Sequence, residues 1–255
     1  MKKFLKILFT LLVISTILFP SANASALSEE EMQLEKQQIH ISSVENYIKY
    51  LDSERNNGNP LAEEGLKKFL LLEKKEQKAF IKALKETEKL SNALAEKEGG
   101  LTTLTTVDDV KVPVRTQEIT EEVPINGATI NALAAGSLTV TATESLYVFN
   151  IKVSTLYTST SFNHNGTSAI SIITGDHWHS NINPAMLFSK EQAASQNYLS
   201  GGRAYHRGNW TVYATGSFGF INDSIQFWVS ANATSRSKQL YSTHPNMTGY
   251  SWKSF

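Results

Sequence analysis

The chain divides into three regions by the spacing of its apolar residues. Residues 7–19 form an almost continuous apolar run, which follows three lysines and ends at Pro20. Across residues 27–98, apolar residues recur at intervals of three and four, the spacing of amphipathic helices. In residues 127–255, apolar and polar residues alternate over short stretches, as they do in strands with one buried face.

The first region has the features of a cleavable export signal. Its apolar run is shorter than the ~20 residues that span a bilayer, and small residues follow it before the first acidic side chain. We expect cleavage after Ala26 or Ala24, so that residues 1–26 are a signal peptide and the protein is secreted and extracellular. No later segment has the length and apolar character of a transmembrane helix, so none is expected after cleavage.

The second region, residues 27–98, predicts helices. Ser28 and Glu31 have the spacing of a capping box. Asn59 precedes a proline, which predicts an N-cap followed by the first helical residue, and a corner is expected near Leu72. The apolar stripe of the first long helix comprises Val44, Tyr47, Ile48 and Leu51. This region is expected to be a helical subdomain that packs on the rest of the chain or a pro-segment that is removed.

Residues 99–126 begin with two glycines and are rich in threonine and acidic residues, which predicts a linker with one or two short extended pieces. Residues 127–255 predict the β-sandwich domain, with a late hairpin that turns at Asn222-Asp223. The expected inner face of that hairpin comprises Trp210, Val212, Ala214, Phe218, Phe220, Ile225, Phe227, Val229 and Ala231. Other strands are expected at 137–143, 147–153 and 169–173. The predicted fold class is α+β, an N-terminal helical segment followed by an antiparallel β-sandwich.

The amino-acid composition argues against several classes of function for this protein. Without cysteine the chain has neither disulfides nor thiol chemistry, so it must fold by packing. Equal numbers of acidic and basic residues argue against nucleic-acid binding. Sequence signatures of the common enzyme families are absent, and the β region holds few acids, which are Glu144, Asp176, Glu191 and Asp223. We therefore expect no enzyme activity and no cofactor.

Histidines give one candidate site. His177 and His179 are two residues apart, so on a strand they point to the same face, where they could share a metal ion with His206 or His164 as a third ligand. Such a site would suit a metal-dependent hydrolase. The alternative is that polar residues around the pair place it in an exposed loop.

A second candidate is a basic aromatic patch formed by Arg203, Tyr205, Arg207 and Trp210. Arginine and aromatic rings together suit a polyanion such as teichoic acid or an anionic membrane surface. Tyr205, Trp210 and Trp228 would serve as exposed stacking groups. The alternative is that Gly201-Gly202 is a tight turn and the arginines are charges at its rim.

The order of signal, helical segment and β region resembles secreted proteins of Gram-positive bacilli of the large unmodified, geobacillin-type bacteriocin group. The resemblance rests on residues 72–84, on Asn183-Pro184 and on residues 198–204 leading to Gly208-Asn209-Trp210. It implies an extracellular antibacterial protein that acts at the envelope of related bacteria, with an envelope or cell-wall polymer as partner, and it implies no active-site residues.

Two alternatives stay open beside this one. The protein could bind cell-wall or matrix polymers without killing. Its Ser/Thr-rich alternating strands are also of the kind that rearrange into membrane-spanning hairpins.

Overall fold

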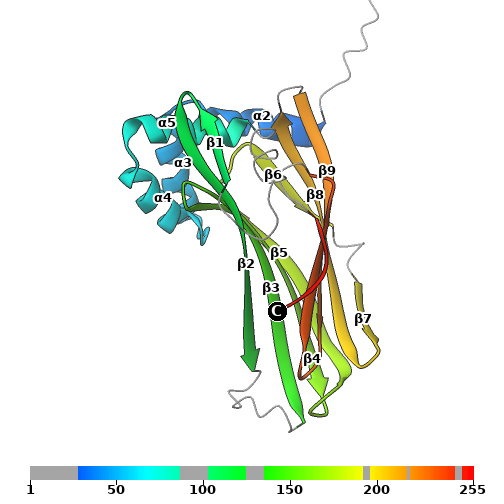
Figure 1. Cartoon of the computed structure of the whole chain (residues 1–255). Helices are drawn as coiled ribbons and strands as arrows, with labels where there is room; N and C mark the ends of the chain where they lie inside the picture. The colour runs from blue at the N-terminus through cyan, green and yellow to red at the C-terminus, as the bar shows by residue number, and fades with distance from the viewer. Residues whose placement is uncertain (1–27, 87–102, 125–134, 192–195, 217–218, 245–248) are drawn as a thin grey trace, which may run out of the picture.

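The computed structural model describes residues 28–86, 103–124, 135–191, 196–216, 219–244 and 249–255. The expected signal peptide, Gly99-Gly100 and Phe218 lie outside these residues. Helices sit at one end of two sheets of long, twisted strands (Figure 1). The predicted fold class is thereby confirmed: a helical segment is followed by antiparallel sheets in a sandwich-like arrangement.

The helical segment begins as the sequence predicts. Ser28 and Glu31 form the expected capping box, with each side chain accepting a hydrogen bond from the backbone N–H of the other residue, at 3.2 and 2.7 Å. The corner near Leu72 is also confirmed. Asn59 Oδ1 accepts from the Leu61 N–H at 3.1 Å, but the helix itself begins at Ala62, two residues later than predicted. The helices are α2 (Glu29–Gln38), the 3₁₀ helix η1 (Ile39–Ile41), α3 (Val44–Asn56), α4 (Ala62–Leu71) and α5 (Lys74–Lys85).

Within the described ranges, no helix combines the length and apolar character needed to cross a membrane.

The first sheet has the order β1-β2-β3-β4-β5, and all its neighbours are antiparallel. Its strands are β1 (Thr103–Val107), β2 (Val110–Pro124), β3 (Gly136–Val148), β4 (Ile151–His164) and β5 (Ala169–Asn181). Strands β1 and β2 lie in the segment 99–126, which was expected to be a linker with short extended pieces. That expectation is corrected, because β2 pairs with β3 over eleven positions and belongs to the sheet.

The second sheet has the order β11-β10-β9-β8-β6, and β7 also pairs with β8. Its strands are β6 (Met186–Lys190), β7 (Gln196–Ser200), β8 (Arg203–Gly216), β9 (Gly219–Ala231), β10 (Arg236–Ser242) and β11 (Tyr250–Ser254). Strands β4 and β5 of the first sheet face β8 and β9 of the second. The two inner faces therefore form the middle of the sandwich.

Two hairpin turns differ from the sequence expectation. The strand expected over residues 147–153 is divided by a turn at Phe149-Asn150, where both residues have positive φ, 50° and 59°. The late hairpin turns between Gly216 and Gly219, so Asn222-Asp223 lies inside β9. The expected alternation holds for Trp210 and Ile225, which pair with each other and are both fully buried. It does not hold for Phe220, because the register pairs this residue with Thr215, an odd number of residues from Trp210.

One hydrophobic core joins the helices to the first sheet. It combines helical residues such as Phe69 and Phe80 with Val112 and Val148 of the sheet, all fully buried. The hydroxyl of Tyr47 donates to the Ile182 carbonyl at 3.0 Å across the same junction. Each large apolar side chain buried here stabilises the fold by about 1.5–3 kcal/mol. The helical segment is thus part of a core that it shares with the first sheet.

Candidate functional site

Four aromatic side chains from four strands meet on the outer face of the second sheet. They are Tyr198 of β7, Tyr205 of β8, Trp228 of β9 and Trp252 of β11. The rings of Tyr198 and Tyr205 are stacked at 4.7 Å, and Trp252 lies edge-on to Tyr205 at 5.9 Å. Trp252 also contacts Trp228, at 6.3 Å between ring centroids. Tyr198 and Trp252 remain 39% and 44% exposed. We call these four residues, with Arg207, the aromatic face.

Strand alternation brings two arginines to the same side of the sheet. Arg207 lies opposite Trp228, and its guanidinium carbon is 5.1 Å from the centre of the Trp228 ring. Arg203 is anchored by hydrogen bonds to Ser230 and to two further serines at residues 235 and 237. The only acidic residue between positions 196 and 255 is Asp223, which pairs with the buried Val212 on the inner side. The aromatic face therefore carries positive charge without a neighbouring carboxylate from its own strands.

Trp210 does not belong to the aromatic face. It is an odd number of residues from the outward-facing Arg207, so its side chain points between the sheets, where it is fully buried. Its ring meets that of His177 edge-on at 5.0 Å. The structure thus brings together three of the four residues of the predicted patch and places Trp210 in the core. Trp228 is at the surface, as predicted, whereas Trp252 was missed because its strand is short and stands alone at the end of the sequence.

The predicted histidine site is only partly assembled. His177 and His206 lie between the sheets with His177 Nδ1 3.3 Å from His206 Nε2, and Asn197 Oδ1 accepts from His206 Nδ1 at 2.6 Å. His179 points to the same side of β5 but packs against the ring of Phe188 at 5.2 Å. Among the described residues, no three His, Cys, Asp or Glu side chains are grouped to hold a metal ion.

Burial explains the charge state of this histidine pair. Burial, and to a smaller extent the neighbouring His177, lower the pKa of His206 to about 4. Burial also lowers the pKa of His177. Both rings are therefore uncharged at neutral pH, and their hydrogen bonds link β5, β7 and β8.

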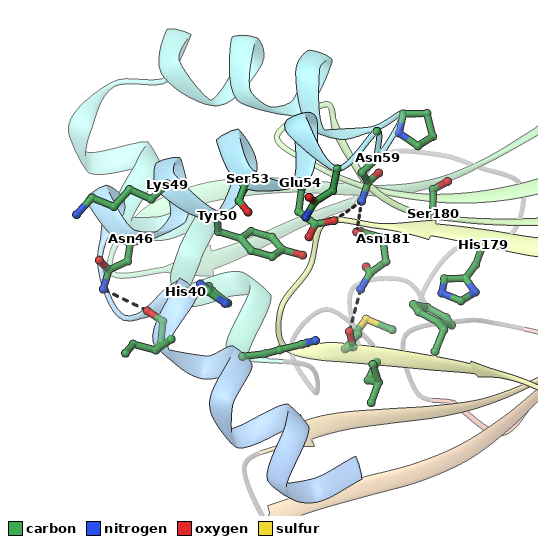
Figure 2. Close-up of a pocket in the computed structure, with 18 residues that line it drawn as sticks. His40, Asn46, Lys49, Tyr50, Ser53, Glu54, Asn59, His179, Ser180 and Asn181 are labelled. Atoms are coloured by element: carbon green, nitrogen blue, oxygen red, sulfur yellow. Dashed lines mark hydrogen bonds between the residues drawn. The ribbon is translucent and has the colours of Figure 1, made fainter. Parts of the chain in front are cut away.

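A groove lies where the helices meet β5 and β6 (Figure 2). Its volume is about 760 Å³. Figure 2 shows Tyr50 and His179 on opposite sides, with Glu54, Asn59 and Asn181 between them. Sequence reasoning did not find this groove, because its walls are more than a hundred residues apart in the chain.

The geometry offers two kinds of binding surface. The aromatic face presents ring faces, which stack on flat or apolar groups, and the guanidinium of Arg207, a group that binds phosphate. The groove presents a mixture of rings, hydroxyls and amides. Searches of protein-family models, curated proteins and solved structures find nothing that matches this chain.

Proposed function

We propose that the protein is a secreted protein that binds an anionic polymer of the bacterial envelope through its aromatic face, and that it acts as a bacteriocin-like antagonist of related bacteria. The proposed binding is supported mainly by one observation, the cluster of Tyr198, Tyr205, Trp228 and Trp252 around Arg207. Large aromatic side chains grouped at a surface are typical of interaction sites.

The chemistry of the surface favours a polymer that alternates phosphate with sugar or polyol units. A guanidinium group matches the geometry of a phosphate and binds it with two hydrogen bonds, as a lysine does not. The exposed parts of Tyr198 and Trp252 offer apolar area for the C–H faces of a polyol or sugar. Teichoic acids of Gram-positive walls have this composition.

Polymer binding without killing is the alternative from another class. Both functions use the same surface, and they differ only in what happens to the bound cell. The resemblance to geobacillin-type bacteriocins is what supports killing, whereas the aromatic face supports binding.

The test of binding uses mature protein purified from culture supernatant, with its N-terminus and mass determined first. It is sedimented with walls of related bacilli before and after chemical removal of their phosphate-bearing polymer. We expect it to pellet with intact walls, to be released as salt is raised, and to stay in solution with stripped walls. Equal sedimentation with both preparations would overturn the assignment of an anionic polymer.

The test of antagonism measures survival of related strains and dye release from vesicles of anionic lipid. Loss of viability at concentrations that saturate the walls supports the antagonist. If the walls are saturated and viability is unchanged, the protein binds the polymer without killing, and the proposal of antagonism is wrong. Dye release from vesicles, which have no walls, would identify the membrane as the target.

A further inference from the structure

The groove between the helices and strands β5 and β6 is separate from the aromatic face. Three parts of the chain form it: the end of α2 with η1, the exposed side of α3 with its exit turn, and the ends of β5 and β6 that face them. Its volume of about 760 Å³ is within the range of ligand sites in proteins. The aromatic face uses none of these residues, so the groove is available for a second ligand.

Hydrogen bonds hold the walls of the groove in place. Asn59 Nδ2 donates to Glu54 Oε2 at 2.8 Å and to the Asn181 carbonyl at 2.9 Å. Asn181 Nδ2 in turn donates to the Met186 carbonyl at 2.8 Å. These contacts connect the turn after α3 to β5 and β6, as Figure 2 shows. A ligand would therefore meet a formed site and would lose little affinity to the ordering of the protein.

Aromatic rings line opposite walls. On the helical side, His40 and Tyr50 are stacked at 4.9 Å with 28° between their planes. On the strand side, His179 lies 5.2 Å from the Phe188 ring at 33°. Figure 2 shows the Tyr50 ring extending toward the space in front of Asn181. Such rings offer apolar faces and polar tips to the same ligand.

The charges of the groove are balanced. Glu54 supplies one carboxylate and Lys49 one ammonium group. Burial and the nearby Lys190 lower the pKa of His179, so this ring is uncharged at neutral pH. Ser53 and Tyr50 add hydroxyl groups that both donate and accept hydrogen bonds. This lining matches a ligand that has many hydroxyl or amide groups and no net charge.

We propose that this groove binds a neutral pyranose unit, such as the N-acetylhexosamine of a wall glycan. The rings of Tyr50 and His179 contact the apolar faces of the sugar, and the hydroxyls of Tyr50 and Ser53 with the free oxygen of Glu54 contact its hydroxyl and acetamido groups. The site is distinct from the one that binds the anionic polymer, so the protein holds two different wall components at once.

The probe is the disaccharide of N-acetylglucosamine. Its binding to the mature protein is measured by saturation-transfer NMR. Ser53 is exposed on α3 and lines the groove, so Ser53→Trp fills the groove without disturbing the core, and Ser53→Ala is its matched control. We expect saturable binding in the millimolar range that Ser53→Trp reduces at least about tenfold and Ser53→Ala changes less than about threefold. Tyr50→Phe, which keeps the ring, weakens binding about threefold to tenfold by loss of one hydrogen bond.

Two further measurements separate this site from the aromatic face. Trp252→Ala leaves disaccharide binding unchanged, and Ser53→Trp leaves sedimentation with an isolated anionic wall polymer unchanged. Absence of saturable binding of the disaccharide to the wild-type protein, or equal binding by Ser53→Trp, would overturn the sugar site without affecting the proposed polymer binding.

Discussion

Acidification should destabilise the fold through buried histidines, and His244 offers the cleanest case. It is 2% exposed two residues after β10, and burial lowers its pKa to about 4 from the ordinary 6.5. Between about pH 6.5 and pH 4, His244 is therefore protonated in the unfolded chain and uncharged in the folded chain. The associated stability is fully present above about pH 6.5 and is lost as the pH falls toward about 4.

The size of the effect follows from the two pKa values. Each pH unit over which only the unfolded chain is protonated costs about 1.36 kcal/mol, so the about 1.5 units between pH 6.5 and pH 5 cost about 2 kcal/mol for His244. The pKa of His206 is likewise lowered to about 4, so it contributes a loss of stability in the same direction over the same interval.

The assay is urea unfolding of the mature protein at several pH values between about 7.5 and 5. His244→Gln cannot take up the proton, so its stability should fall about 2 kcal/mol less than that of the wild type over this interval. Tyr241→Phe, a neighbouring exposed position that keeps both histidines, is the matched control and should follow the wild type. Parallel pH profiles for the wild type and His244→Gln would show that proton uptake by His244 does not destabilise the fold.

Three other changes test the packing. Phe69→Ala removes a fully buried ring between helices and sheet, and should lower the free energy of unfolding by about 3–5 kcal/mol in urea. Gly208→Ala should cost about 1–3 kcal/mol in the same assay, because its Cβ would lie 2.6 Å from His177 Cβ and 2.7 Å from Trp210 Cη2; unchanged stability would contradict this close approach. A chain that starts at Leu101, as removal of a pro-segment would leave it, loses the helical half of the shared core. It should lose its near-ultraviolet circular dichroism, and a native spectrum would show that the helices are dispensable.

Local features of the fold were readable from the sequence because they depend on neighbouring residues. The capping box needs only Ser28 and Glu31, and the alternation of β8 and β9 needs only a period of two. The turn at Phe149-Asn150 was not readable, since phenylalanine is not a typical turn residue. The backbone N–H of Phe149 donates to the Pro113 carbonyl at 2.8 Å, and the Phe149 ring packs against the core. Both contacts form only in the folded protein.

Part of the candidate site could be predicted from the sequence. Alternation alone puts Arg203, Tyr205 and Arg207 on one face, and the same argument excludes Trp210 from it, so the predicted patch contained one residue too many. Trp252 joins the aromatic face through strand β11, whose neighbours in the sheet cannot be deduced from so short a segment. The groove depends on how the helices dock on β5 and β6, which no local pattern specifies.

Paired tryptophan variants test whether the aromatic face binds the anionic wall polymer. Trp252→Ala removes a ring from the aromatic face, whereas Trp178→Ala removes a similarly exposed ring, stacked on Tyr157, from the outer face of the other sheet. Both variants are sedimented with isolated walls of a related bacillus. We expect Trp252→Ala to weaken binding at least about tenfold and Trp178→Ala to bind as the wild type does. Equal binding by the two variants would contradict binding through the aromatic face.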